Sequence, residues 1–276
     1  MRPMMSNLDV ARIRQPLSEL ASAGLENLES FSSVASTNTY LLSQAAPPSG
    51  RYRVAVADHQ TSGRGRHYRR WISTPGSGLC MSVAFTFGRT VDQLSGLTLA
   101  IGTGVIAALR QLGYVDVALK WPNDIVALDS KLGGILTEIQ SGKGDGTTVV
   151  TGVGLNVKLP DKLDIDGESN WSVAAVDLHS CKKEMPEREL LAGTLIEHLF
   201  RTFTRFDEQG LTGFVDDWQQ SDWLRNRVIT VDMPDRQVTG IAAGIDNDGA
   251  LLVDSKSGRS RVISGSIVMV GARPSP

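Results

Sequence analysis

The sequence predicts an α+β protein with a mostly antiparallel or mixed sheet and a few helices, followed by a small all-β unit. Strand patterns recur between residues 52 and 159, and two long amphipathic helical patterns interrupt or follow them. From about residue 224 the chain consists of short strand patterns split by turn signals such as "NDG" and "KSG". We therefore expect a short N-terminal helical segment at 1–30, a large domain at 31–222 and a small β domain at 223–276.

The elements follow in this order. Residues 1–30 have a weak helical pattern, and "SVASTNTYLL" begins a polar helix with Ser36 or Thr37 as N-cap. Helices are expected at about 92–112 and 186–206, with a short helical segment at 211–223. Strands are expected in "YRVAVADHQ" (52–60), "GLCMSVAFTF" (78–87), "VDVALKW" (115–121), "KLGGILTEIQ" (131–140) and "TTVVTGVGLNVKL" (147–159).

The composition limits the function classes. The chain has 28 Lys+Arg and 30 Asp+Glu, and this net charge of −2 argues against bulk attraction to nucleic acid or to an anionic membrane. Cys80 and Cys181 have no metal-like spacing, which favours a reducing compartment. With neither a secretory h-region nor a long apolar run, a soluble cytoplasmic protein without a membrane span is expected.

One strand pattern is cleared of side chains on one face. In "VVTGVGLNV" (149–157), alternation puts Gly152, Gly154 and Asn156 on one face, opposite Val153 and Leu155. Glycine weakens a strand and usually marks a bulge or a close approach. A flat ligand on the sheet would explain both glycines, and so would a bulge or packing against a helix.

Two neighbouring motifs carry charged candidates. In "KLGGIL" (131–136), Lys131 precedes two glycines, so it either reaches across a cleared surface or guards an edge strand. In "KWPND" (120–124), Asp124 is a candidate Mg²⁺ ligand or a partner of Lys120, or else part of a simple strand-ending turn.

The stretch "GRGRHYRRW" (63–71) concentrates positive charge in a nearly neutral chain. Gly63 and Gly65 allow close approach of the backbone, and the arginines offer forked donors to phosphate or carboxylate. A phosphate-binding loop, a nucleic-acid contact and a solvated turn remain open, although the net charge disfavours nucleic acid. Together with the glycine strands, this loop predicts a site for an anionic nucleotide and a small ligand. No Ser/His/Asp, Cys/His or zinc-ligand pattern competes with it.

The motifs "STN" (36–38), "HQTSGRGR" (59–66), "KWPND", "KLGGIL" and "GVGLNV" (152–157) resemble those of biotin–protein ligases in order and spacing. The C-terminal "AAGIDNDGALLV" is similar to the SH3-like barrel of that family. The resemblance covers about residues 30–272. It implies a sheet of the class II aminoacyl-tRNA-synthetase and biotin-ligase type with helices, followed by an SH3-like β-barrel.

The resemblance also implies a two-step reaction. Biotin and MgATP would give biotinyl-5′-AMP and pyrophosphate, and biotin would then pass to one lysine of the biotin carboxyl carrier protein of acetyl-CoA carboxylase. ATP and Mg²⁺ would act as co-substrate and metal, with no tightly bound prosthetic group. The protein would be a monomer or a homodimer.

Site residues follow from the resemblance motif by motif. Lys131, bridging the biotin carboxylate and the α-phosphate, and Arg66 would be catalytic. Biotin contacts are implied for Ser36, Thr37, Asn38, Gln60, Gly63, Arg64, Gly65, Arg66, Lys131, Gly134, Gly152 and Gly154. Contacts to ATP or the adenylate are implied for Arg64, Arg66, Arg69, Lys120, Asn123, Lys131, Asn156 and Trp171, and a Mg²⁺ contact for Asp124.

Two features depart from the family pattern. The family loop usually continues Gly-Arg-Gly-Arg-Arg-Gly-Arg, whereas His67 and Tyr68 replace the fifth and sixth residues here. A difference is therefore expected in loop mobility and retention of the adenylate. The residues before "SVASTN" are too few for the winged helix of members that also repress transcription, so a ligase-only form without operator binding is expected.

Two other functions compete with this interpretation. A lipoate–protein ligase shares the fold and chemistry but normally lacks this β tail and the pairing of "KWPND" with "KLGGIL". A ligand-sensing, nucleic-acid-binding regulator would instead use the basic loop and show salt-dependent affinity for DNA.

Overall fold

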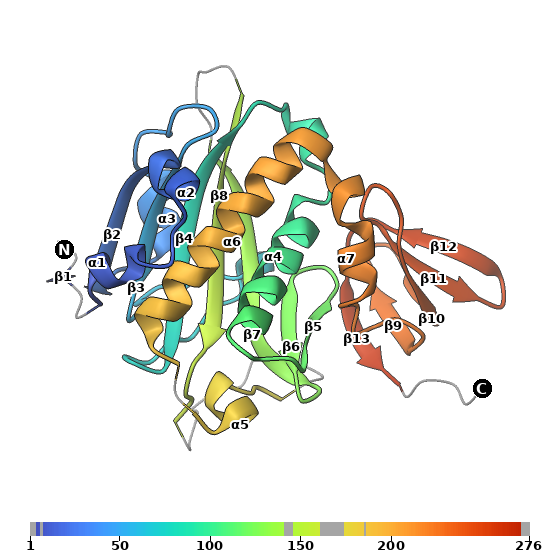
Figure 1. The fold of residues 1–276 in the computed structure, drawn as a ribbon. Coiled ribbons are helices and arrows are strands. Elements are labelled where there is room, and N and C mark those ends of the chain that lie inside the picture. Colours follow the sequence, from blue (N-terminus) through green and yellow to red (C-terminus); the bar gives the residue numbers. More distant parts are fainter. Residues whose placement is uncertain (1–3, 6–7, 141–145, 161–173, 185, 272–276) are drawn as a thin grey trace.

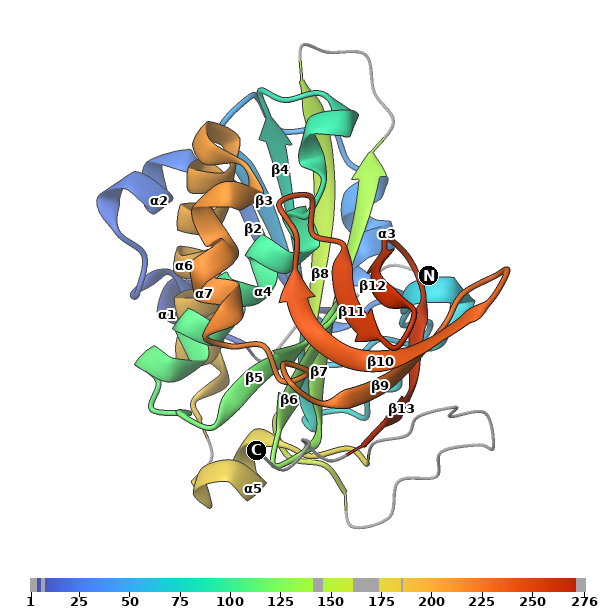
Figure 2. The same cartoon turned by 90° about the vertical axis from the view of Figure 1, so that its right-hand side faces the viewer.

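The structure is a computed structural model that describes residues 4–5, 8–140, 146–160, 174–184 and 186–271. An eight-stranded sheet with its helices lies beside a five-stranded sheet (Figure 1), and the smaller sheet faces the viewer in Figure 2. The predicted α+β class is confirmed. Within the described ranges, no helix has the length and apolar character needed to cross a membrane.

The large sheet is mixed, as predicted. Its strand order is β1-β2-β3-β4-β8-β7-β6-β5, and among its described pairs only β2 and β3 run parallel. The strands are β1 Met4–Met5, β2 Leu25–Ser33, β3 Tyr52–Ala57, β4 Gly78–Phe87, β5 Val117–Lys120, β6 Asp124–Ala127, β7 Ser130–Gln140 and β8 Thr147–Asn156.

Helices cover the two faces of this sheet differently. Helices α4 and α6 cross one face (Figure 1), while α3 packs on the other face against β3, β4 and β8. The helices are α1 Val10–Arg14, α2 Glu19–Gly24, α3 Thr37–Leu42, α4 Leu97–Gln111, α5 Leu178–Lys182, α6 Arg188–Gln209 and α7 Val215–Gln219, with 3₁₀ helices η1 Arg66–Tyr68, η2 Val91–Leu94 and η3 Leu211–Phe214.

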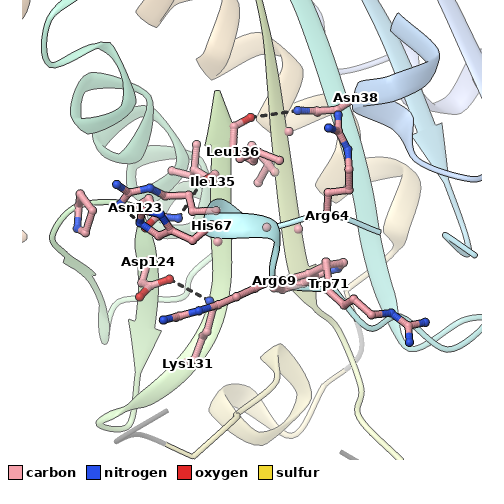
Figure 3. Close-up of a pocket in the computed structure, with 18 of the residues that line it drawn as sticks. Asn38, Arg64, His67, Arg69, Trp71, Asn123, Asp124, Lys131, Ile135 and Leu136 are labelled. Carbon is pink, nitrogen blue, oxygen red and sulfur yellow. Dashed lines mark hydrogen bonds and ion pairs between the residues drawn. The ribbon is translucent and has the colours of Figure 1, made fainter. Parts of the chain in front are cut away.

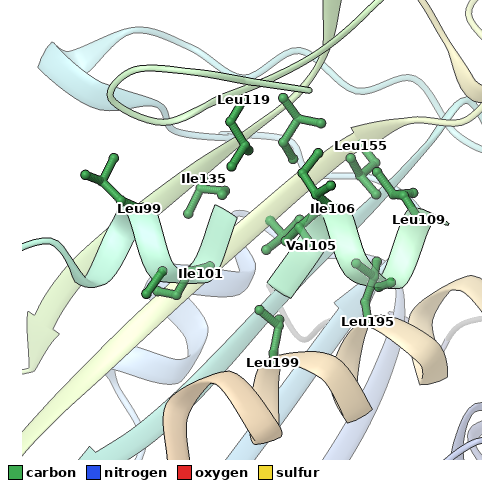
Figure 4. Packing of buried hydrophobic residues seen from close by; sticks show 14 of the residues in the cluster. Leu99, Ile101, Val105, Ile106, Leu109, Leu119, Ile135, Leu155, Leu195 and Leu199 are labelled. Atoms are coloured by element: carbon green, nitrogen blue, oxygen red, sulfur yellow. The ribbon is translucent and has the colours of Figure 1, made fainter. Parts of the chain in front are cut away.

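The main core lies between the sheet and the α4–α6 pair. Ile101 and Val105 of α4, Leu195 and Leu199 of α6 and Leu155 of the sheet are buried in one cluster (Figure 4). The two residues of each helix lie four positions apart, so they share one helix face, as expected for the two amphipathic helical patterns in the sequence.

The predicted helix at 92–112 is in fact broken near its start. Gly96 has a φ of 76°, and Leu211 packs where its Cβ would lie, so η2 ends before the turn and α4 begins at Leu97. Similarly, the short helical segment predicted at 211–223 ends at Gln219.

The N-terminal prediction was wrong in one respect. Helical structure was expected up to residue 30, but α2 ends at Gly24 and strand β2 begins at Leu25. Leu25, Leu28 and Phe31 are buried, and β2 pairs with β3 from Leu25 to Phe31. The sequence "LENLESFSS" has little intrinsic strand preference, so this long-range pairing decides its conformation.

The C-terminal sheet is antiparallel with the order β12-β11-β10-β9-β13. Its strands are β9 Val228–Asp232, β10 Gln237–Ile245, β11 Leu251–Ser255, β12 Gly258–Val262 and β13 Ser266–Val270. Two hydrogen bonds link it to the large domain: the Trp121 indole, in the turn after β5, donates to Gly249 O at 3.0 Å, and Ser95 Oγ, between η2 and α4, donates to Asp248 O at 2.8 Å. Both acceptors lie in the turn between β10 and β11.

Candidate active site

A cavity of about 1310 Å³ opens on the α3 face of the large sheet, beside β13 of the small one. The basic loop at 63–71 passes over it (Figure 3). Most of the predicted site residues line this one cavity. They are Ser36, Thr37, Asn38, Gln60, Arg64, Gly65, Arg66, Arg69, Lys120, Asn123, Asp124, Lys131, Gly134, Gly152 and Gly154.

The first turn of α3 forms a polar end of this cavity. Ser36 is the N-cap, and its Oγ accepts a hydrogen bond from Thr39 N at 3.4 Å. The Thr37 N–H donates to Gln60 Oε1 at 2.8 Å, and Ser82 Oγ of β4 lies 2.6 Å from Thr37 Oγ1. Hydroxyl and amide groups arranged in this way suit a neutral ligand group that both donates and accepts.

Asn38 is fixed on the sheet from three sides. Its Nδ2 donates to Leu136 O at 3.2 Å and to Glu138 Oε2 at 2.8 Å, and its Oδ1 accepts from Ser82 Oγ at 2.6 Å. A Cβ at Gly152 would lie closer than 3.0 Å to Oδ1, so the glycine makes room for the amide. Both amide hydrogens serve contacts within the protein, and Asn38 shapes the polar end.

Trp71 covers the second glycine of the same strand. A Cβ at Gly154 would lie 2.6 Å from Trp71 Cε2, and Lys131 Nζ lies 5.8 Å from the indole centroid, within cation–π range. The two glycines therefore accommodate side chains of the protein itself: Gly152 makes room for Asn38 at the polar end, and Gly154 makes room for the Trp71 indole, which forms a flat wall of the cavity. Trp71 was missed from the sequence, although an aromatic residue directly after a run of arginines was a usable signal.

The basic loop is a tight hairpin. Trp71 N donates to Gly63 O at 3.0 Å, and Gly65 N donates to Arg69 O at 2.7 Å. Gly63 does not line the cavity; a Cβ there would collide with the Trp71 carbonyl, so this glycine serves the hairpin. His67 is one of the two residues that depart from the family pattern. Its φ of 54° lies in the left-handed region, which residues other than glycine rarely adopt.

The opposite end of the cavity is cationic. Lys131 Nζ lies 2.9 Å from Asp124 Oδ1 (Figure 3). The register of β6 and β7 shifts between Ile125 and Val126, so Lys131 and Gly134 both face the cavity instead of lying on opposite faces. "KWPND" proves to be a turn between two strands, with a cis Trp121–Pro122 bond.

Burial lowers the pKa values of several cationic side chains in the cavity. Desolvation lowers the pKa of Lys120 and of Lys131, while the Asp124 carboxylate beside both raises it. Burial also lowers the pKa of Arg66, whose Nη1 donates to Asn123 Oδ1 at 3.4 Å. Six lysine and arginine side chains line the cavity against two aspartates among the described residues, so the site attracts anions.

Two further predicted residues lie elsewhere. Asn156 does not line the cavity; its Nδ2 donates to Lys131 O at 3.3 Å and Val176 O at 2.9 Å, so it fixes the backbone that carries Lys131. Trp171 lies outside the described residues.

The side chains of the cavity can bind a metal ion only together with phosphate groups of a substrate. Within the described ranges, no three His, Cys, Asp or Glu side chains are grouped to hold an ion. Mg²⁺ usually binds one or two carboxylates together with waters and substrate phosphates, and Asp124 at the cationic end can supply one such carboxylate.

The chain matches two protein-family models. Residues 30–156 match the biotin/lipoate A/B protein ligase family, and residues 226–270 match the biotin protein ligase C terminal domain. In sequence, these two matches place the protein in the biotin and lipoate ligase class.

Individual relatives narrow this class. The chain is 34% identical to the biotin–[acetyl-CoA-carboxylase] ligase of Mycobacterium tuberculosis, over 95% of this chain and 98% of that protein. It is 33% identical to the bifunctional ligase/repressor BirA of Escherichia coli, over 79% of this chain and 66% of that protein, so it spans about two thirds of that relative's length. The chain belongs to the biotin protein ligase family.

A solved structure agrees in fold. The biotin protein ligase from Aquifex aeolicus in complex with biotin and ATP matches with a TM-score of 0.73 at 24% identity. The match covers 88% of this chain and 97% of that one.

Proposed function

We propose that the protein activates biotin with ATP to biotinyl-5′-AMP and transfers the biotinyl group to a lysine of the biotin carboxyl carrier protein of acetyl-CoA carboxylase. The order of surfaces along the cavity carries this proposal: a polar end at Thr37 and Gln60, a flat wall at Trp71 and a cationic end at Lys131. Biotin has the same order, with a polar ureido ring, an apolar chain and a carboxylate.

The first step brings two anions together. An oxygen of the biotin carboxylate forms a bond to the α-phosphorus of ATP, and the bond from that phosphorus to pyrophosphate breaks. Biotin is itself the nucleophile, so the protein has to orient the reactants and stabilise negative charge. We assign the bridging position between carboxylate and α-phosphate to Lys131, because it lies between the Trp71 wall and Asp124.

The other cations would hold the phosphates. Arg66, Arg69 and Lys120 line the same end as Lys131, and Asn123 orients Arg66. When MgATP binds, the Asp124 carboxylate would leave Lys131 and bind the Mg²⁺ ion instead. This metal would screen the phosphate charges.

The second step uses the carrier lysine. Its neutral amine attacks the carbonyl carbon of the adenylate, a C–N bond forms, the C–O bond to AMP breaks, and the nitrogen loses a proton. The polar end at Ser36, Thr37 and Gln60 would hold the ureido ring in both steps.

Transfer of labelled biotin to a carrier domain in the presence of ATP and Mg²⁺ tests the proposal, with lipoate run in parallel. We expect ATP-dependent labelling of one lysine and none on a carrier in which that lysine is replaced by arginine. The absence of biotin transfer, or a preference for lipoate, would contradict the proposal.

A further inference from the structure

One carboxylate joins three separate elements at the polar end of the cavity. Glu138 lies on β7, and its Oε2 accepts hydrogen bonds from Arg64 Nη2 at 2.7 Å and from Asn38 Nδ2 at 2.8 Å. Arg64 belongs to the basic loop and Asn38 to α3. Glu138 therefore links loop, helix and sheet at a single point.

Strand geometry puts Glu138 on the cavity face. Across the β7–β8 ladder, Glu138 pairs with Val150 and Leu136 pairs with Gly152. Residues two apart on a strand share a face, so Glu138 points to the same side as the glycine that accommodates Asn38.

The Arg64 side chain is directed away from the cationic end. It lies beside Asn38, whereas Arg69 and Lys131 lie near Asp124 in another part of the cavity (Figure 3). The Arg64 backbone also bridges to Arg70 on the returning arm of the hairpin. A contact that holds Arg64 thus restrains both arms.

We propose that Glu138 is a positioning residue that anchors the basic loop, and that Arg64 acts through this anchor and not on the phosphates of ATP. For its effect on catalysis the inference rests on the proposed function, but the anchor itself exists without substrate. Charge-assisted hydrogen bonds of this kind exceed neutral ones in strength. The Arg64 and Glu138 side chains are 42% and 25% exposed, so solvent weakens the pair, and its loss should favour loop opening by about three- to tenfold.

Limited proteolysis tests the anchor without any ligand. Trypsin cleaves after arginine, and the loop offers four sites, at Arg64, Arg66, Arg69 and Arg70. In Glu138→Gln the side-chain oxygen can still accept from Asn38 while the charge is lost. We expect early cleavage within 64–70, identified by mass spectrometry, to accelerate about three- to tenfold.

The chain offers a matched control. Glu26 pairs with Arg51 at 26% and 45% exposure, and neither residue lines the cavity. Glu26→Gln should leave loop cleavage at the wild-type rate. Equal cleavage rates in wild type and Glu138→Gln would overturn the anchor, as would equal acceleration in both variants.

A double-mutant cycle then tests the role of Arg64. Glu138→Gln and Arg64→Gln should raise the KM for biotin and the release rate of the adenylate by the same factor, and the double variant should match the singles. A kcat for adenylation that falls in Arg64→Gln but not in Glu138→Gln would show that Arg64 acts on the phosphates and would refute the inference. Failure of the wild type to transfer biotin would contradict the proposed function alone, because the proteolysis comparison does not depend on it.

Discussion

Replacement of Gly152 by alanine tests how the polar end of the cavity is built. An added Cβ would lie closer than 3.0 Å to Asn38 Oδ1 and 3.1 Å from Asn38 Cγ. The strand backbone is paired on both sides, with β4 and with β7, so the Asn38 side chain has to move.

The cost of this movement follows from the contacts of Asn38. Its amide is held by Ser82 Oγ, Leu136 O and Glu138 Oε2 at 2.6, 3.2 and 2.8 Å. Loss of two such hydrogen bonds at about 1 kcal/mol each, with some overpacking, gives about 2–4 kcal/mol. If the free energy of biotin binding becomes about 2 kcal/mol less favourable, the Kd for biotin rises roughly 30-fold.

Calorimetric titration with biotin, together with thermal unfolding, measures this effect. Gly88→Ala is the control, because a Cβ there would lie 3.6 Å from Asp207 Oδ2, an ordinary contact, and Gly88 does not line the cavity. We expect the control to bind as the wild type does. Gly152→Ala that binds biotin within twofold of wild type, with an unchanged Tm, would refute the reasoning.

Three other predictions concern charge. Lys131→Ala should slow pyrophosphate release in the adenylation step by about 10²–10³-fold while circular dichroism stays unchanged, because one cation at the reacting centre is lost; a near-normal rate would remove Lys131 from the mechanism. Burial raises the pKa of Asp222 to about 6, so the folded state binds this proton more tightly than the unfolded state and the free energy of unfolding falls as pH rises from about 4 to about 6. Asp222→Asn should remove this decline, at most about 3 kcal/mol, in denaturant titrations at several pH values, and an unchanged slope would contradict the assignment. Duplex DNA should bind only weakly at 200 mM salt in fluorescence anisotropy, and a nanomolar sequence-specific complex would contradict a purely enzymatic role.

The strand "VVTGVGLNV" shows what a sequence pattern determines. Alternation is fixed by backbone geometry, so the prediction that Gly152 and Gly154 share a face opposite Val153 and Leu155 is confirmed by the burial of the apolar pair. The pattern did not reveal what the glycines accommodate. That depends on Asn38 and Trp71, which lie far away in the sequence and arrive through α3 and the basic loop.

Prediction from the sequence failed where pairing between distant strands determines the structure. Residues 25–33 look helical or irregular by local preference, yet pairing with β3 makes them a strand. Ser82 and Glu138 were missed for a related reason, since a serine or a glutamate within a strand is informative only once its neighbours across the sheet are known. The register shift that turns Lys131 into the cavity is likewise a property of the β6–β7 pair.

The charge of the cavity favours a compact anion over a polymer. The chain as a whole carries −2, whereas the cavity gathers six cations against two aspartates among the described residues. Salt screens exposed charges within about 10 Å at 0.1 M ionic strength, so such a cluster acts mainly on what enters the cavity. Burial, together with repulsion from the Arg69 guanidinium, lowers the pKa of both Lys120 and Lys131. A bound carboxylate and phosphate would raise both pKa values, because an adjacent negative charge favours the protonated amine. Ligand binding and lysine protonation therefore strengthen each other.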